Sequence, residues 1–463
     1  MFRHCFLILF LMYSNYAHSS SFEYRDYGDK KCRMGAVSAQ DWAIDLTAII
    51  GGSSFNNYKA SGTSKFENNT YRAEKIINLA VGQCLKMNEG EKSCEEIING
   101  IDSWRSKKYL MPKSRHDSPD WWEESFQSNE LMITILEALN IANTRLGKKV
   151  EPDSEMAKWL FEISRKTMKV DLTKANHRTS WILTAAKTSL LTNNKINIGN
   201  RKKTAIELIN DELAFQFGMM EDNGALPEEA IRGVRAVWYT GRQLGYLTAL
   251  LEIGEKLGIG SYTQYETQLH KAVTFMLDSI DDVEVIYPYA KKMKASPKGD
   301  PRIQDYGIGN GGAWGTFSFM KVYASRFPTH PNVNRMSSHP LVGRFLSEDS
   351  VKIKGFGIDV GCLNPDVELA PAAAVTPIQS ADNLEKKLAC FMANAQARGL
   401  KNLPTENEIK NLIEIVASNN ATKISKFALR RFGLQAQTIA EHEESLLRAV
   451  QPEESSDKYC EQP

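Results

Sequence analysis

Two groups of polar residues have types and spacings that could act on an anionic molecule. The first is the pair Asn176-His177, at the head of an amphipathic segment. The second is a stripe of two arginines and two tyrosines that share one face if the segment is helical. Its members are Arg235, Tyr239, Arg242 and Tyr246. Guanidinium groups bind carboxylates and tyrosine hydroxyls transfer protons, but solvated arginines beside half-buried tyrosines would produce the same spacing.

Composition limits the partners that such a site could have. The 463 residues include 57 Lys and Arg against 56 Asp and Glu, with 42% hydrophobic residues. This is enough apolar material for a sizeable core, and it excludes a disordered chain or a small disulfide scaffold. A balanced charge provides no general basic field, so we expect no nucleic-acid partner and a local cationic cluster for any acidic substrate.

The beginning of the chain is typical of an export signal. Arg3 and His4 precede an apolar run at 6–12, and Ala17-His18-Ser19 suits a signal peptidase. We therefore predict a signal peptide at 1–19. The run is too short to span a bilayer, and no later run approaches the roughly 20 apolar residues of a membrane helix. The mature protein is expected to be an exported monomer without a membrane span, periplasmic or extracellular.

Export changes the interpretation of the cysteines. Cys5 leaves with the signal peptide, and an oxidising compartment allows the others to pair. These are Cys32, Cys84, Cys94, Cys362, Cys390 and Cys460. None has the spacing of a zinc site, so we expect no metal. Many pairings are compatible with the spacing, which therefore selects none.

Helical periodicity dominates the chain, and the alternation typical of strands is hardly found. Apolar residues recur at helical spacing in 130–146, 155–168, 179–191, 203–219, 231–257 and 263–280. Polar connectors at 192–201, 222–224 and 296–301 separate them. The pattern predicts an all-α fold of helix pairs, and periodicity alone leaves a bundle, a solenoid or a toroid open.

The composition changes after Cys362. A Pro- and Ala-rich run at 366–381 predicts an extended linker, and helical patterning returns in 382–463. We therefore expect a main domain at 20–365, followed by the linker and a helical C-terminal extension.

Several segments resemble the mannuronate-specific alginate lyases. The segment from Gly224 to Leu247, with Gly-Ala-Leu-Pro-Glu-Glu and Arg-Ala-Val-Trp-Tyr, resembles their G-x-L-P-x-E and R-A-L-x-Y-H helix. Asn176-His177 followed by Trp181 is similar to their N-N-H-x-Y-W segment, and 314–328 to a late helix ending in Tyr-Ala-Arg-Phe-Pro. Ser64-Lys65-Phe66-Glu67 resembles an S-K-Y-E loop. The ordered matches cover roughly residues 32–345.

The resemblance implies an α/α toroid that cleaves a uronic-acid polysaccharide by β-elimination, without a metal or cofactor. Asn176, His177 and Arg235 match the positions that neutralise the C6 carboxylate, so that the C5 proton can leave. A tyrosine takes that proton and protonates the departing O4. The resemblance also places substrate-binding side chains and a disulfide. They are Trp181, Lys65 and Phe66 at the substrate, and Cys32 paired with Cys94.

The sequence departs from the family pattern at the catalytic tyrosine. That position, seven residues after Arg235, holds Arg242, and the family's histidine is Thr240. Arginine stays protonated and cannot abstract a proton. Tyr239 and Tyr246 lie three residues before and four after Arg242, within reach of its charge on a helix. We favour Tyr239 as the base, with Tyr246 as the fallback.

Three functions are compatible with these observations. We favour a secreted lyase acting on an acidic polysaccharide. The alternative is a noncatalytic polyuronate binder in which Arg235 and Arg242 clamp carboxylates. A hydrolase on the same scaffold is the third, although the adjacent Glu228 and Glu229 point to different helix faces and do not form its carboxylate pair. Only elimination yields an unsaturated uronate, which absorbs in the ultraviolet.

Overall fold

The computed structural model describes most of the middle of the chain. The described residues are 73–347 except for 75, 79, 86–89, 109, 112–120, 168–174, 199, 293–298, 307–311, 318 and 340–341. The chain divides into two compact units, Met1–Gln304 with Gly315–Leu369 and Asp305–Trp314 with Ala370–Pro463. Nearly all described residues belong to the first unit. Several predictions lie outside the described residues, namely those for 1–19, 366–381, 382–463, Cys32, Lys65 and Phe66.

The predicted all-α architecture is confirmed for the described residues. The longer helices are α4 (Gly90–Ser106), α5 (Trp121–Arg145), α6 (Glu155–Thr167), α7 (Ala175–Thr192), α8 (Ala205–Gly218), α10 (Ala236–Lys256) and α11 (Ser261–Asp281). Shorter elements are α9 (Pro227–Ala230), α12 (Tyr287–Ala290), α13 (Gly312–Phe317), α14 (Phe319–Arg326), α15 (Pro331–Ser338), α16 (Gly343–Ser347), and the 3₁₀ turns η2 (Gly233–Arg235) and η3 (Val283–Val285).

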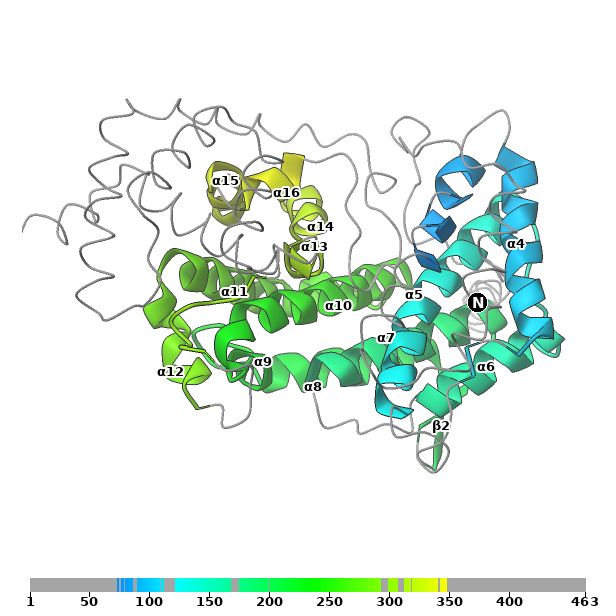
Figure 1. Cartoon of the computed structure of the whole chain (residues 1–463), viewed down its shortest axis with the longest axis horizontal. Helices are drawn as coiled ribbons and strands as arrows, with labels where there is room; N and C mark the ends of the chain where they lie inside the picture. Colours follow the sequence, from blue (N-terminus) through cyan, green and yellow to red (C-terminus); the bar gives the residue numbers. More distant parts are fainter. Residues whose placement is uncertain are drawn as a thin grey trace, which may run out of the picture. The chain divides into compact units, whose positions relative to one another are not determined.

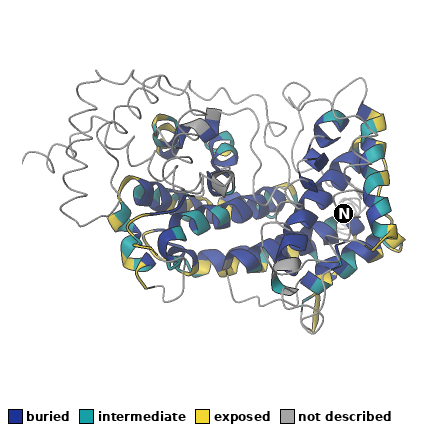
Figure 2. Cartoon of the chain, viewed as in Figure 1, coloured by how far each residue is buried: buried dark blue, intermediate teal, exposed yellow. Residues whose placement is uncertain are grey.

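Helices α7 and α10 form the centre of this arrangement. Helix α7 packs against α5, α6, α8 and α10, and α10 packs against α8, α11 and α14 (Figure 1). The ribbon of α10 is buried along most of its length (Figure 2), and Leu244, Leu247 and Leu251 are fully enclosed. Each such leucine stabilises the fold by about 1.5–3 kcal/mol through burial. Central, enclosed helices hold the side chains at their ends in defined positions.

A short connection reverses the chain between α10 and α11. Gly258 and Gly260 have φ values of 73° and 67°, a conformation that residues with a Cβ rarely adopt. The two helices consequently lie side by side as a hairpin (Figure 1). Among the described helices, none combines the length and the hydropathy needed to cross a bilayer.

The connector predicted at 192–201 contains a small antiparallel ribbon. Strands β1 (Ile196–Ile198) and β2 (Arg201–Lys203) pair with Asn197 opposite Lys202. The chain then enters α8 through a capping box, in which Thr204 and Glu207 exchange side-chain and backbone hydrogen bonds. The ribbon is too short for its alternation to be visible in the sequence.

The predicted pairing of Cys32 with Cys94 is wrong, because Cys94 forms a disulfide with Cys84. Cys94 lies near the start of α4 and its Cα is 4.7 Å from that of Cys84. A Cβ on Gly90 would lie 2.2 Å from the carbonyl oxygen of Cys84, so a glycine is required where the two segments meet. The bridge therefore closes a short local loop, and the resemblance could not distinguish it from a longer one.

Candidate active site

The helix expected at 231–257 is broken at the end that should carry the site. Gly233 has a φ of 61°, which interrupts the helix between α9 and α10. Arg235 is the residue before α10, with a φ of −112°, so it does not share the helical face of Tyr239. Gln304 satisfies the backbone at the break. It accepts from the Val237 N–H at 3.1 Å and donates to the Gly233 carbonyl at 3.0 Å. The prediction of a four-residue stripe is therefore wrong at Arg235.

A buried carboxylate joins the start of α7 to α9. Glu229 accepts hydrogen bonds from the backbone N–H of Asn176 at 2.7 Å and from its side-chain Nδ2 at 2.8 Å. Burial raises the pKa of Glu229 to about 7, although the charge of Arg232 and the hydrogen bonds from Asn176 oppose this. The Oδ1 atom of Asn176 is buried and has no hydrogen-bond partner among the described residues. One acceptor at the head of α7 is thus left for a ligand.

His177 lies within a group of aromatic rings. The rings of Trp122 and Phe126 on α5 meet it edge-on, each with its centre 4.9 Å away, and Trp181 stacks at 5.9 Å. Trp181 is fully buried. The prediction that Trp181 binds substrate is therefore wrong, because a sugar ring could not reach its face. Its ring packs against His177 and fixes the orientation of the imidazole.

Arg242 and Tyr246 form a buried cluster with Glu130 of α5. The Tyr246 hydroxyl donates to Glu130 at 2.6 Å, and Arg242 contacts both, through Nε to the hydroxyl at 3.2 Å and through a terminal nitrogen to the carboxylate at 3.1 Å. Burial raises the pKa of Tyr246 well above its ordinary value, against the opposing charge of Arg242. Arg242 does act to lower the pKa of Tyr246, but burial outweighs it, so Tyr246 is not an activated base.

Tyr239 is the tyrosine of the stripe that remains accessible. The guanidinium of Arg232 lies 3.9 Å from the centre of the Tyr239 ring, and that of Arg235 lies 4.6 Å from the ring of Trp238. The charge of Arg242 also interacts with Tyr239. Tyr239 is half-buried, and its hydroxyl makes no hydrogen bond to the described residues. Tyr239 thus lies under one arginine and within the field of a second, with its hydroxyl open to a substrate.

Arg232 was missed by the sequence analysis. Its Nε is buried without a partner among the described residues, although its guanidinium covers Tyr239. On a continuous helix, Arg232 and Tyr239 would lie about two turns apart on nearly the same face, and Arg235 would share that face, so the spacing did not distinguish the two arginines. The Arg-Gly-Val-Arg spacing contains the signal, since the glycine allows the break that brings this arginine over the tyrosine.

Contacts and charge interactions join the site residues. Phe126 touches both His177 and the guanidinium of Arg242, which lies 4.9 Å from the centre of its ring. Glu229 binds Asn176 and lies within the field of Arg232 and Arg242. Within the described part of the chain, no group of three or more His, Cys, Asp or Glu is arranged to hold a metal ion. The arrangement can bind a carboxylate and move a proton.

Residues 99–286 match the alginate lyase family model. The site residues from Trp122 to Tyr246 lie within this matched segment. A search of the curated proteins found no significant sequence match.

This chain is similar to solved structures of alginate lyase A1-III over much of its length. A variant complexed with tetrasaccharide has a TM-score of 0.50 at 12% identity, covering 76% of this chain and 97% of that one. The enzyme from Sphingomonas species A1 has a TM-score of 0.46 at 16% identity, covering 61% and 76%. The first likeness shows that the fold is an α/α toroid of helical hairpins. With the family match to the alginate lyase region, it supports a polysaccharide lyase enzyme.

Proposed function

We propose that the protein cleaves an alginate-type polymer of uronic acids by β-elimination, with polymannuronate as the first candidate substrate. The observation that carries the proposal is the accessible Tyr239 hydroxyl, whose ring lies under the guanidinium of Arg232 and interacts with the charge of Arg242. The match of residues 99–286 to the alginate lyase family supports the same chemistry.

The reaction needs a base and a cationic pocket. Arginines and His177 stabilise the negative charge that develops on the C6 carboxylate when the C5 proton leaves. Tyr239, as the tyrosinate, takes this proton, so that the C5–H bond breaks and its electron pair is held as an enolate over C5, C6 and the carboxylate oxygens. The C4–C5 double bond then forms as the C4–O4 bond breaks, and the Tyr239 hydroxyl gives the proton to O4. One tyrosine thus serves as base and acid, and no net proton is consumed.

We propose in addition that the protein is exported and acts as a monomer in the periplasm or outside the cell. The signal-like residues 1–19 support export. The Cys84–Cys94 disulfide supports an oxidising compartment, since such bonds persist there and are rare in the cytosol. Fractionation of the producing cells, with mass spectrometry of the mature N-terminus, tests this part of the proposal.

The decisive experiment is incubation with polymannuronate, polyguluronate and polyglucuronate while ultraviolet absorbance is followed. Elimination produces an unsaturated uronate and a rise in absorbance, which Tyr239→Phe should abolish. New reducing ends without absorbance would indicate a hydrolase. Binding of a polyuronate without any product would indicate a noncatalytic binder in which the arginines act as a carboxylate clamp.

A further inference from the structure

Glu229 holds Asn176 in one orientation. Its carboxylate faces both the backbone N–H and the side-chain Nδ2 of Asn176, at 2.7 and 2.8 Å. An ionised carboxylate can only accept hydrogen bonds, so the nitrogen of the amide must face Glu229. The oxygen is left on the other side, buried and without a partner among the described residues. Buried acceptors are rarely left unpaired, which points to a donor supplied by a ligand.

We propose that Glu229 is a positioning residue whose charge determines which atom of Asn176 meets the substrate. The inference rests on the proposed function and deepens it. With Glu229 ionised, Asn176 presents Oδ1 and accepts a hydrogen bond from an O–H group of the uronate. With Glu229 protonated, the carboxyl donates to Oδ1, the amide turns over, and Nδ2 faces the substrate. The ionised form supports elimination.

Both forms of Glu229 are accessible near neutral pH. Burial raises its pKa to about 7, while the charges of Arg232 and Arg242 and the hydrogen bonds from Asn176 favour the ionised form. Helices α7, α10 and α12 pack against α9. The other titratable side chains on these three helices are His177, Arg178, Lys187, Tyr239, Tyr246, Glu252, Glu255, Lys256, Tyr287 and Tyr289. A proton on Glu229 therefore changes the local charge beside two fixed cations.

The variant Glu229→Gln isolates this effect. The oxygen of the introduced glutamine can accept from the backbone N–H of Asn176, and the nitrogen of its amide can only donate. The variant therefore holds the Asn176 side chain in its turned orientation at every pH. Above neutral pH we expect kcat for elimination to fall by about tenfold or more, the scale of one lost buried hydrogen bond to substrate. The wild-type rate should fall as pH is lowered through the titration of Glu229, and the variant should lack this limb. Glu228→Gln, at the exposed neighbouring position, should retain the wild-type profile.

A double-mutant cycle shows whether Glu229 acts through Asn176. In an Asn176→Ala background, Glu229→Gln should cause little further loss, because the amide that it orients is absent. An equal loss with and without Asn176 would overturn the inference, as would a Glu229→Gln enzyme with unchanged kcat and pH profile. If Glu229→Gln does not fold, the pH profiles of the wild type and Asn176→Ala still test the inference. The fall in rate at low pH should be absent from Asn176→Ala, and its persistence there overturns the inference.

The outcomes separate this inference from the proposed function. Unsaturated product without coupling between the two residues overturns the inference alone. If a polyuronate is bound but not cleaved, the proposed function fails, and the same cycle measured on Kd supports or overturns the inference. A protein that neither cleaves nor binds these polymers overturns both. Methyl-esterified polymer identifies the substrate group that donates to Asn176 Oδ1. If the coupling between Glu229 and Asn176 survives esterification, the donor is a sugar hydroxyl. If the coupling is lost, the donor is the protonated carboxyl of the uronate.

Discussion

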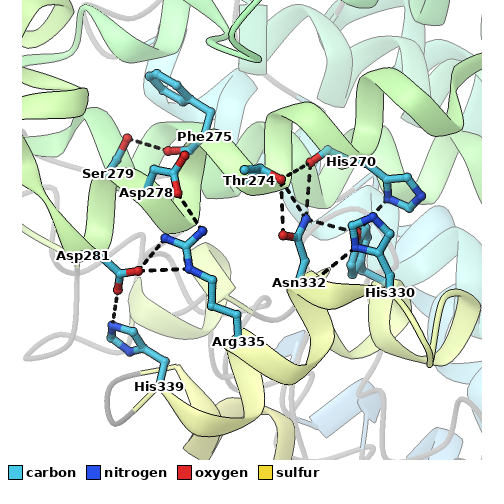
Figure 3. Close-up of polar contacts among 11 residues, drawn as sticks. His270, Thr274, Phe275, Asp278, Ser279, Asp281, His330, Asn332, Arg335 and His339 are labelled. Atoms are coloured by element: carbon cyan, nitrogen blue, oxygen red, sulfur yellow. Dashed lines mark hydrogen bonds and ion pairs between the residues drawn. The ribbon is translucent and has the colours of Figure 1, made fainter.

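Two polar regions of the molecule differ in how completely their side chains are paired. One is the candidate site at the ends of α7, α9 and α10. The other joins α11 to α14 and α15 through a network in which no buried side-chain nitrogen or oxygen of the residues drawn lacks a partner (Figure 3). Both contain histidine, asparagine, arginine and tyrosine, so residue type alone does not distinguish them.

The α11–α15 network is closed on itself. The Tyr323 hydroxyl lies 2.7 Å from Nδ1 of His270 and 2.9 Å from Nδ1 of His330, and Asn332 donates to Thr274 at 3.0 Å (Figure 3). Burial raises the pKa of Tyr323 above its ordinary value. A neutral hydroxyl held between two imidazoles ties α14 to α11, and this hydroxyl is already paired within the described residues.

The candidate site leaves several polar atoms open. Asn176 Oδ1, Arg232 Nε and the Tyr239 hydroxyl have no hydrogen-bond partner among the described residues. Folding alone would favour pairing the two buried atoms, those of Asn176 and Arg232, because an unpaired buried polar group costs about 1–3 kcal/mol. The contrast indicates that a closed polar network stabilises helix packing, whereas an open one is set for a ligand.

The largest expected effect is that of removing one hydroxyl. Tyr239→Phe should lower kcat for elimination by about 10²- to 10⁴-fold, because it removes the group that transfers the proton. Tyr323→Phe, the same change in the closed network, should leave kcat unchanged and lower the free energy of unfolding by about 1 kcal/mol. Progress curves and denaturation of both variants test the comparison. Similar losses of kcat in the two would contradict it.

Glu229 should make stability depend on pH. Its pKa is about 7 in the folded protein against an ordinary value of 4.5. The folded state therefore retains a proton that the unfolded chain releases. Its contribution to stability is complete below pH 4.5 and is lost as pH rises through about 7, a change of roughly 3 kcal/mol. Glu229→Gln should remove this part of the slope in urea denaturation, and identical slopes would contradict the assignment.

Arg232 provides a third test of the open site. Arg232→Ala should lower kcat by about 10²-fold, because it removes a charge-stabilising donor beside the reacting groups. Arg232→Lys should restore little, since an ammonium cannot reproduce a guanidinium that stacks on Tyr239. Steady-state kinetics with melting temperatures separates this loss from unfolding. Full activity in Arg232→Ala would remove this arginine from the site.

The sequence predicted the helices well because their cores are periodic. The segments expected at 155–168 and 263–280 correspond to α6 and α11 within one or two residues. These boundaries depend on local patterns of apolar residues and turn residues. The same patterning could not detect the break at Gly233, because apolar residues continue at helical spacing through 231–257.

The site was predicted only as far as local spacing determines it. Asn176, His177 and Tyr239 were proposed from spacing and resemblance. In the structure, Phe126 contacts both His177 and Arg242, and Glu229 binds Asn176. Tyr246 is paired with Glu130 and buried, and Trp181 is fully buried. Such partners lie over 50 residues away in the chain, so no local pattern indicates them.

The smallest effect is expected from the closed region. Arg335 on α15 donates to Asp278 at 2.6 Å and to Asp281 at 3.0 Å, and Nε2 of His339 also contacts Asp281 at 3.0 Å (Figure 3). Against the raising effect of burial, hydrogen bonds from His339 and Arg335 hold the pKa of Asp281 below its ordinary value.

Arg335→Ala should therefore lower the free energy of unfolding by about 1 kcal/mol or less, since these groups are part-exposed and solvent screens their attraction. Because the pKa of Asp281 is lowered in the folded state, its contribution is present above the ordinary carboxyl pKa and is lost as pH falls through the folded value. The difference between wild type and Arg335→Ala should shrink in acid and in high salt, while kcat stays unchanged. A loss of kcat without a loss of stability would show that this region takes part in catalysis.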